Sequence, residues 1–392
     1  MRSDALSAWK AGMQEGLRSL EGRSQRRSLA EIHGVNFCSN DYLGLAENPV
    51  LRERVAEAVR AAEKVGGTGS RLLSGQTEAW RDLEEEFAKF AGTESALFFT
   101  SGYAANVGLF SSLAGKDDVI FSDERNHASL IDGMRLSGAR KVIYPHLNLN
   151  ALEDTLRQEA GAPWRKVIVT ESVFSMDGDI APLQEIASLA EKYKAALILD
   201  EAHATAVHGP GGRGLAAAVG LTHRVLAITH TCGKALASAG AFVCGPAELK
   251  EHLVNHARTF IFSTALPPYF AAQIRAALHL AGGMESDREA LLQRAAEMRG
   301  ALQAEGFDTA GTASQIVPVI LGGNEATLDA AEHLQREGFA VRGIRPPTVP
   351  EGGSRLRLSL TTRIAREELS QLVQSLVAWR SRQTSTACAR HA

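Results

Sequence analysis

A lysine that stands apart from every other charge is the first residue of this sequence that could do covalent chemistry. Lys234 lies in HTCGKALASAG, and no other charged residue occurs from Thr231 to Gly245. An amine among small and apolar neighbours is poorly hydrated, which favours its neutral, nucleophilic form and suits it to Schiff-base formation. The alternative is an ordinary surface lysine in a loop, so the lysine needs partners before it indicates a site.

An acid at the end of an apolar run is the second candidate. Asp200 follows ALIL, and a carboxylate at the end of a buried strand is costly unless a cation pairs with it. A helix N-cap is the alternative role. The letters LILDEAH also resemble the Mg²⁺ segment of helicases and ATPases, which need GxxxxGKS or GxxxxGKT. Neither Gly115-Lys116 nor Gly233-Lys234 has that context, which argues against a nucleotide-driven motor.

Further polar residues follow other apolar runs. Ser101, Gly102 and Tyr103 come after ALFFT, where SGYAAN begins a predicted helix. The free N–H groups at such a helix start can bind a phosphate. His127 follows DVIFS; a lone histidine is more often structural, but this one accompanies the lysine, the acid and the phosphate cradle. Together these groups predict a pyridoxal phosphate (PLP) site.

The strands that must position these residues alternate with helical segments. Short apolar runs occur at ALFFTS, DVIFSD, KVIYP, KVIVTES, ALILDEAH, RVLAITH and GAFVCG. The clearest βαβ unit spans residues 166–203, with Pro182 in the first turn of its helix. Strands this uniformly apolar are covered by helices on both faces. We therefore predict an α/β domain with a mostly parallel, doubly wound sheet, whose carboxyl edge collects the candidate residues.

Two smaller parts flank this predicted domain. Residues 1–45 open with helical spacing of Leu6, Trp9, Met13, Leu17 and Leu20. Near residue 281 the strand runs stop and a charged helix follows, after which IVPVIL, FAVRGI and RLRLSL read as strands around a helix that Gly338 ends. We expect an N-terminal helical segment over 1–45, a large PLP-binding α/β domain over 46–280 and a smaller C-terminal α+β domain over 281–392.

Length and composition exclude several classes of protein. The chain has 392 residues, of which 45% are hydrophobic and 22% charged, as in globular enzymes rather than disordered chains. Its formal net charge of −3 argues against a nucleic-acid partner held by bulk positive charge. No apolar run is long enough to cross a membrane, and Asp4 and Glu15 interrupt the place where a signal peptide has its apolar core. We expect neither a nucleic-acid nor a membrane partner.

Cysteine spacing and short motifs narrow the chemistry further. The cysteines are Cys38, Cys232, Cys244 and Cys388, and they form no CxxC pair. We therefore predict no disulfide framework and no metal site, and a cytoplasmic location suits these thiols. The GxGxxG letters at 209–214 follow HATAVH instead of a strand and predict a turn. Neither GxSxG nor HExxH occurs, which removes the simplest hydrolase interpretations.

With these residues assembled, the chain resembles the α-oxoamine synthases, which belong to the fold-type I PLP enzymes related to aminotransferases. The resemblance covers nearly the whole chain and rests on motifs that occur in the order of the family. They are FCSNDYLGL at 37–45, SGYAAN at 101–106, NHAS at 126–129, ESVFSMDGDIAPL at 171–183, DEAH at 200–203, TCGK at 231–234, FIFSTALPP at 260–268 and IRPPTVP at 344–350.

The resemblance implies a role for each matching residue. Lys234 would bind the cofactor covalently and then take the α-proton of the substrate. Asp200 would keep the pyridine nitrogen protonated, and His127 would stack on the ring and contribute to catalysis. The other implied cofactor contacts are Gly102, Tyr103 and Thr231 to the phosphate, Ser175 and His203 to the phenolic oxygen, and Thr264 of a second subunit to the phosphate.

The substrate side is implied in the same way. Arg357 would bind the substrate carboxylate, because its planar guanidinium matches a carboxylate bidentately. Asn40, His127 and Thr348 would line the substrate side, and Arg18 is matched to an arginine that contacts the acyl chain.

Three segments bear on the substrate within the family. SRLLSG at 70–75, IRPPTVP and SRLRLSL at 354–360 most resemble the members that condense L-alanine with a pimeloyl thioester in biotin biosynthesis. The thioester would be carried by coenzyme A or acyl carrier protein, and the enzyme would be a homodimer with its active site at the subunit interface. Members that use glycine or serine with another acyl-CoA are the alternative. A non-catalytic protein that kept the fold is a second alternative, and it would be colourless.

Two positions depart from the family pattern. Cys232 stands where a bulky apolar residue usually precedes the Gly-Lys pair, and Ala206 replaces a glycine that usually follows DEAH. Neither change removes a reacting group, but Ala206 is expected to alter the backbone near the cofactor.

Overall fold

The chain folds into two compact units in the computed structural model, which describes residues 2–29, 31 and 33–391. Side chains are described for residues 4–29, 31 and 33–383, so the predicted free thiol of Cys388 lies outside them. Unit 1 comprises Met1–Ser39, Met176–Gly178 and Leu292–Ala392, and unit 2 comprises Asn40–Ser175 and Asp179–Leu291.

The unit boundaries lie at 39/40 and 291/292, whereas the sequence places them at 45/46 and 280/281. Pairing explains the first difference, because strand β1 (Val35–Asn36) runs parallel to β10 (Phe339–Ala340) within unit 1. A strand of two residues has no readable periodicity. The second boundary falls inside one continuous helix, α12 (Glu285–Ala304), where no turn signal marks it.

Unit 2 is built on a seven-stranded sheet in the order β2-β8-β7-β6-β5-β3-β4. The strands β3 to β7 pair in parallel, whereas β8 is antiparallel to both of its neighbours, so the sheet is mostly parallel as predicted. The strands are β2 (Ser95–Phe99), β3 (Asp118–Asp123), β4 (Arg140–Tyr144), β5 (Arg165–Glu171), β6 (Ala195–Asp200), β7 (Ala227–Thr231) and β8 (Ala241–Gly245).

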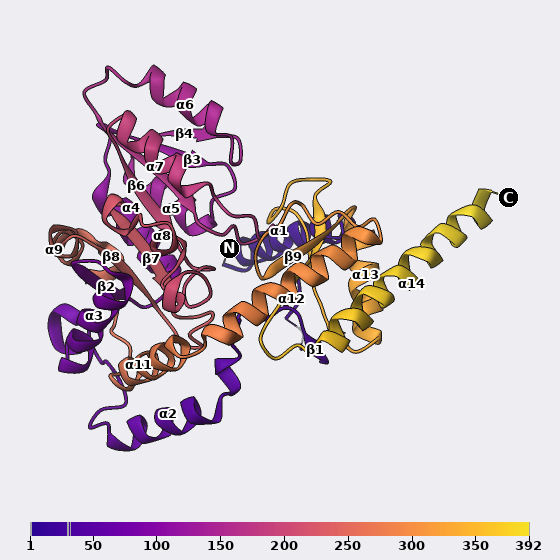
Figure 1. The fold of residues 1–392 in the computed structure, drawn as a ribbon. Coiled ribbons are helices and arrows are strands. Elements are labelled where there is room, and N and C mark those ends of the chain that lie inside the picture. Colours follow the sequence, from indigo (N-terminus) through magenta and orange to yellow (C-terminus); the bar gives the residue numbers. More distant parts are fainter. Residues whose placement is uncertain (1, 30, 32, 392) are drawn as a thin grey trace. The chain divides into compact units, whose positions relative to one another are not determined.

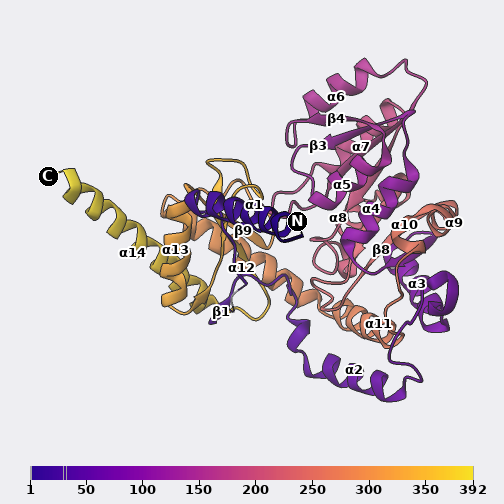
Figure 2. The ribbon, with the colours of Figure 1, turned by 180° about the vertical axis from the view of Figure 1, so that it is seen from behind.

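Helices cover both faces of this sheet, as the two opposite views of Figures 1 and 2 show. The helices of unit 2 are α2 (Pro49–Ala61), α3 (Glu78–Ala91), α4 (Gly102–Leu113), α5 (Ala128–Ser137), α6 (Leu149–Gln158), α7 (Leu183–Lys192), α8 (Leu215–Ala218), α9 (Ala247–His256), α10 (Arg258–Ile261) and α11 (Tyr269–Gly282). Short helical turns occur at Leu45–Glu47, Arg71–Gly75, Pro210–Gly212 and Thr222–Arg224. The predicted helix after Pro182 is confirmed as α7.

The apolar strand residues divide between two cores, one on each face of the sheet. In β3, Ile120 belongs to the core under α4, α5 and α9, whereas Val119 and Phe121 belong to the core under α6 and α7. The same alternation holds in β5, where Val167 and Ile168 point to opposite cores. This two-sided burial is why the strands are apolar throughout, and it confirms the doubly wound arrangement.

Unit 1 contains a three-stranded antiparallel sheet in the order β11-β12-β9. Helix α13 packs on all three of these strands, and α14 packs on α13, which makes this part α+β as predicted. Its remaining elements are α1 (Arg2–Gly22), β9 (Ile316–Gly322), α13 (Asn324–Arg336), β11 (Gly343–Ile344), β12 (Ser354–Ser359) and α14 (Arg366–His391).

Two details of unit 1 differ from the sequence expectation. The run FAVRGI is not one strand but two, because β10 pairs with β1 and β11 pairs with β12, so the chain changes partner at Val341 and Arg342. The helix predicted at the N-terminus is confirmed as α1, but Leu6, Trp9 and Met13 on its apolar side are exposed. Among the described residues, no helix is both long and apolar enough to span a membrane.

Candidate active site

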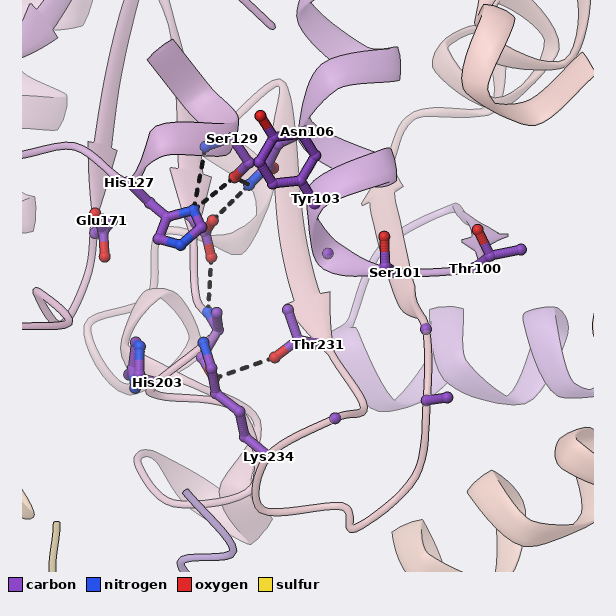
Figure 3. Close-up of a pocket in the computed structure, with 16 residues that line it drawn as sticks. Thr100, Ser101, Tyr103, Asn106, His127, Ser129, Glu171, His203, Thr231 and Lys234 are labelled. Carbon is purple, nitrogen blue, oxygen red and sulfur yellow. Dashed lines mark hydrogen bonds between the residues drawn. The ribbon is translucent and has the colours of Figure 1, made fainter. Parts of the chain in front are cut away.

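The carboxyl edge of the unit 2 sheet carries a cavity of about 390 Å³ (Figure 3). Its walls come from the ends of β5, β6 and β7, from the start of α4 and from the segment that follows β3. Parallel strands that end at one edge bring together residues far apart in the sequence. Seven residues predicted for the cofactor site line this cavity: Gly102, Tyr103, His127, Asp200, His203, Thr231 and Lys234.

The start of α4 forms an anion cradle at one end of the cavity. Ser101 caps the helix by accepting a hydrogen bond at Oγ from the Ala104 N–H at 3.0 Å. The N–H groups of Gly102 and Tyr103 belong to the first turn, which has no intrahelical acceptors for them. A Cβ on Gly102 would lie 2.7 Å from Thr231 Cγ2, so glycine lets the helix start approach the Thr231 side chain. This geometry suits a phosphate.

Asp200 supplies a buried carboxylate beneath the cavity. It is 5% exposed, and its Oδ2 accepts a hydrogen bond from Asn106 Nδ2 at 2.7 Å while Oδ1 accepts one from the Ala202 N–H at 2.8 Å. Lys234, in the loop between β7 and β8, is close enough for its charge to act on two other cavity residues, His127 and Glu171.

His127 is held in one orientation and kept neutral. Its Nδ1 lies 2.8 Å from Ser129 Oγ and accepts a hydrogen bond from the Ser129 N–H at 3.2 Å, so the imidazole caps α5. One face is open to the cavity, but the surrounding protein lowers the pKa of His127, with Lys234 adding to this effect and Asp200 opposing it. A neutral, oriented imidazole is suited to stacking on an aromatic ring.

His203 is positioned by a tyrosine that the sequence did not single out. Tyr42 is fully buried, and its hydroxyl lies 2.7 Å from His203 Nδ1 and donates to Asn40 Oδ1 at 3.1 Å. Asn40 is thus linked to the cavity through Tyr42, although it does not line the cavity itself.

Two predicted cofactor residues of unit 2 do not line the cavity. Ser175 lies in the loop after β5, where its backbone N–H opposes the effect of burial, which raises the pKa of the Glu171 carboxyl group. Thr264 is exposed and pairs with Ser70 in an isolated antiparallel bridge. The apolar side chains of Leu72 and Phe262, in the same two segments, are 50% and 69% exposed.

The predicted substrate residues Arg18, Thr348 and Arg357 belong to unit 1. Arg357 is buried on β12 and donates to Ser359 Oγ at 2.6 Å, while Thr348 is exposed and accepts a hydrogen bond at Oγ1 from Arg27 at 3.0 Å. Arg18 is also exposed and pairs with Glu15 at 2.6 Å, one helical turn away.

Sequence reasoning did not single out Asn106, Ser129 and Glu171, which also line the cavity. Asn106 joins Asp200 to Ser129, to which it donates at 2.9 Å. Glu171 ends β5 in register with Asp200 on β6, so its position at the end of an apolar strand was the signal that could have identified it.

The two departures from the family pattern differ in their consequences. Cys232 is fully buried, and its backbone N–H donates a hydrogen bond to the Gly240 carbonyl at 2.9 Å. Its side chain does not line the cavity. Ala206 has φ of 64°, in the left-handed region that disfavours a side chain. A glycine at this position would therefore be the unstrained residue.

The donor set fits PLP. A helix start bounded by Gly102 suits its phosphate, a buried carboxylate suits its protonated ring nitrogen, and a lysine in the same cavity suits its aldehyde. Among the described residues, no three His, Cys, Asp or Glu side chains are grouped to hold a metal ion.

Comparison with known sequences finds proteins similar to this chain over most of its length. Residues 32–376 match the family of class I and II aminotransferases. An 8-amino-7-oxononanoate synthase of Geobacter sulfurreducens is 47% identical over 370 residues, which cover 93% of this chain and 94% of that protein.

Solved structures with the same fold include a palmitoyltransferase and a synthase. A serine palmitoyltransferase variant (K265A) from S. paucimobilis with a bound PLP–myriocin aldimine matches 94% of this chain and 96% of its own, with a TM-score of 0.86 and 28% identity. The 8-amino-7-oxononanoate synthase of Francisella tularensis matches 90% of this chain and 99% of its own, with a TM-score of 0.78 and 28% identity.

Proposed function

This chain belongs to the class I and II aminotransferase family and, within it, to the 8-amino-7-oxononanoate synthases, and on that premise we propose its reaction. It condenses L-alanine with a pimeloyl thioester. The new bond joins the alanine Cα to the thioester carbonyl carbon, the C–S bond breaks to release the thiol, and the carboxyl group of alanine leaves as CO₂. The product is 8-amino-7-oxononanoate, an intermediate of biotin biosynthesis.

PLP is the cofactor, and different residues of the cavity are suited to its phosphate and to its ring nitrogen. The start of α4 at Gly102 and Tyr103, with Thr231, would hold the phosphate, and Asp200 would hold the ring nitrogen in its protonated form. When bound, PLP supplies an electron sink for the electron pairs that alanine releases on losing its α-proton and its carboxyl group.

Side chains of the cavity would transfer protons and orient the cofactor. The Lys234 amine would take the α-proton of alanine at Nζ, which requires a neutral amine, and would return a proton to the same carbon after CO₂ has left. His127, whose pKa is lowered, would cover the ring face in its neutral form and border the bound substrate. Ser175 and His203 complete the site at the phenolic oxygen, and Tyr42 fixes the orientation of His203 at 2.7 Å from Nδ1.

The proposed substrate residues are Arg357 and Thr348 of unit 1 and Asn40 of unit 2. Arg357 binds the carboxylate of alanine, for which its planar fork is suited. Thr348 and Arg27 contact the acyl chain of the thioester. Arg27 suits this role better than Arg18, because Arg27 donates a hydrogen bond directly to Thr348. Coenzyme A and acyl carrier protein both remain candidate carriers of the pimeloyl group.

We further propose a cytoplasmic homodimer in which Thr264 completes the phosphate site of the partner subunit. The exposed apolar side chains of Leu72, Leu73 and Phe262 support this arrangement, because they adjoin Ser70 and Thr264 in sequence and would be buried by a partner. The described cysteines Cys38, Cys232 and Cys244 are free thiols, in keeping with a reducing compartment.

The observation that carries the proposal is the meeting of Lys234, Asp200 and His127 in one cavity with the α4 anion cradle. The experiment is a visible spectrum of the purified protein, recorded before and after L-alanine, glycine or L-serine and then pimeloyl-CoA, with the product identified by mass spectrometry. A yellow protein whose spectrum responds to alanine, and which forms 8-amino-7-oxononanoate, supports the proposal. A response to glycine or serine alone assigns the chain to a sister synthase, and a colourless protein that PLP cannot reconstitute contradicts it.

A further inference from the structure

One histidine joins the ends of three neighbouring strands of the unit 2 sheet. His146 follows β4, and its Nδ1 lies 2.8 Å from Oδ1 of Asp123, the last residue of β3. Its Nε2 contacts Oδ2 of Asp179 in the loop after β5. The Asp123 side chain is fully buried, and those of His146 and Asp179 are 10% and 13% exposed. None of the three lines the cavity, so the proposed reaction gives them no direct role.

The carboxylate of Asp123 is held in place by two backbone groups besides His146. Its Oδ1 accepts a hydrogen bond from the Arg125 N–H at 2.9 Å, and its Oδ2 accepts one from the Leu147 N–H at 2.9 Å. Arg125 precedes His127 by two residues, in the segment between β3 and α5. Asp123 therefore fixes both the segment that leads to His127 and the residue that follows His146.

The side chain of Asp179 is held by His146. Its Oδ2 contacts His146, whereas its Oδ1 is buried without a hydrogen-bond partner among the described residues. In the backbone, the Asp179 carbonyl accepts a hydrogen bond from the Phe174 N–H at 3.0 Å. Ser175 is the next residue after Phe174. His146 is thus connected, through Asp179, to the backbone that carries Ser175.

Phe174 gives His146 a second contact with the same loop. The centroids of the two rings are 4.5 Å apart, with an interplanar angle of 88°, and Phe174 is buried. The base of the loop is closed by an isolated antiparallel bridge between Val173 and Ile180. His146 therefore contacts this loop at Phe174 and Asp179, two residues that are hydrogen-bonded to each other.

We propose that His146 is a positioning residue of the cofactor site, which binds Asp179 and thereby fixes the loop of Ser175 against the end of β3. The inference rests on the proposed function, which assigns Ser175 to the phenolic oxygen of PLP and His127 to its ring. The loop of Ser175 and the segment that leads to His127 would then be held together before PLP binds. Groups oriented in advance do not have to be ordered during the reaction.

Substitutions at Asp179 and His146 test the link without changing a residue of the cavity. Asp179→Asn keeps an acceptor oxygen for His146 Nε2, whereas Asp179→Ala and His146→Leu remove the hydrogen bond. We expect hydrogen exchange in the full chain without PLP to be about tenfold faster at the Phe174 and Ala181 N–H groups in Asp179→Ala and His146→Leu. Asp179→Asn should stay within about threefold of wild type. The double variant His146→Leu/Asp179→Ala should exchange no faster than His146→Leu, because both substitutions remove the same interaction.

The spectrum of bound PLP reports whether the loop acts on the cofactor. Protein groups that contact PLP tune its electronic properties, so Ser175→Ala should shift the visible band of the PLP-loaded protein. Asp179→Ala and His146→Leu should shift the band in the same direction and raise the Kd for PLP about tenfold. Asp179→Asn should leave the band in place and the Kd within about threefold.

Asp118→Ala is the matched control. Asp118 is buried and pairs with Arg165 at 2.7 Å, and these are the first residues of β3 and β5, at the opposite ends of the same two strands. Loss of this ion pair removes a carboxylate from unit 2 without touching the loop of Ser175. It should leave the exchange of the Phe174 N–H group, the visible band and the Kd for PLP unchanged.

The outcomes separate this proposal from the proposed function. Exchange in Asp179→Ala within threefold of wild type, or faster exchange in the double variant than in His146→Leu, overturns the role of His146. An unshifted band in Asp179→Ala overturns it too, provided that Ser175→Ala shifts the band. If His146→Leu does not fold, the Asp179 pair decides, because equal exchange in the Asn and Ala variants contradicts a hydrogen-bonded link. A wild-type chain that binds no PLP refutes the proposed function, whereas the exchange comparison still decides whether His146 fixes the loop.

Discussion

Asn106 Nδ2 donates a hydrogen bond to Asp200 Oδ2 at 2.7 Å, and both side chains are buried. The same amide group donates to Ser129 Oγ, which lies 2.8 Å from His127 Nδ1. One helix residue therefore links Asp200 with His127, the two side chains that we propose as partners of the cofactor ring. The link orients both side chains before any ligand binds. The reaction then does not have to supply the entropy that would be lost in orienting them.

Removal of this amide should slow the reaction. We expect Asn106→Leu to lower kcat/KM for L-alanine about 10- to 100-fold, because a hydrogen bond to a charged group contributes about 1.5 to 3 kcal/mol. Steady-state kinetics measure the change. Asn255→Leu is the control, since Asn255 is exposed and bonds only to the Glu251 carbonyl of its own helix. A kcat/KM within twofold of wild type for Asn106→Leu would show that the link has no catalytic value.

His146 makes the stability of unit 2 depend on pH. Its Nδ1 lies 2.8 Å from Asp123 Oδ1, and its Nε2 contacts Asp179. Burial alone would lower the pKa of His146, but its hydrogen bonds to the two carboxylates outweigh burial and raise it to about 9. Because the folded pKa lies above the unfolded value, the contribution is fully present below about pH 6.5 and is lost as the pH rises through about 9.

Denaturant unfolding can measure this contribution. The free energy of unfolding of the wild type should exceed that of His146→Gln by about 2 kcal/mol near neutral pH, and the difference should shrink at alkaline pH. His279→Gln is the control, because His279 also pairs with an acid, Glu86, but is 66% exposed. A difference in the free energy of unfolding that does not change with pH would contradict a protonated His146 bound between Asp123 and Asp179.

Shared active sites can be tested by mixing two inactive variants. Lys234→Ala removes the amine of one site, and Thr264→Arg is expected to block the phosphate site of the partner. A mixed dimer then has one intact site, so refolding the two together at equal amounts should restore about a quarter of the wild-type activity. Activity assays after mixing, with each variant alone as the control, provide the measurement. No recovery in a confirmed mixed dimer would place Thr264 in the site of its own subunit.

Ala206 stores backbone strain that a glycine would relieve. With φ of 64° and its N–H donating to the Gly212 carbonyl at 2.7 Å, it is held in the left-handed region. Ala206→Gly should raise the free energy of unfolding by about 1 kcal/mol. Ala330→Gly, inside α13, should lower it by about the same amount. Chemical denaturation of both variants checks the opposite signs, and destabilisation by Ala206→Gly would disprove the strain.

The two N-terminal arginines should differ in their effect on the acyl substrate. Arg27→Ala is expected to raise the KM for the pimeloyl thioester at least about tenfold without changing the KM for alanine, because Arg27 donates to Thr348. Arg18→Ala should change neither value, since Arg18 is exposed and pairs with Glu15. Equal effects of the two substitutions would contradict this assignment.

The strands and the main cofactor residues were predictable because the information that defines them is local. Apolar runs such as those of β5 and β6 have their own periodicity, and Asp200 and Lys234 were recognisable from where they stand relative to such runs. The sheet-edge rule then placed these residues in one cavity, as the structure confirms for seven of them.

The remaining features of the site depend on contacts between residues that are far apart in the sequence. Asn106 and Asp200 are 94 positions apart, and Tyr42 and His203 are 161 apart, so no local pattern reports their hydrogen bonds. Glu171 is one more strand-end acid until the register of β5 against β6 sets it beside Asp200. The division of the N-terminal segment at residue 39 likewise follows from the pairing of β1 with β10.

The residue types and their order along the chain thus determined which kinds of chemistry this protein can carry out. The state in which each group works was decided only by the fold, because orientation and protonation depend on which donors, charges and apolar surfaces surround a side chain. Those neighbours are brought together by packing across strands and helices that are distant in sequence.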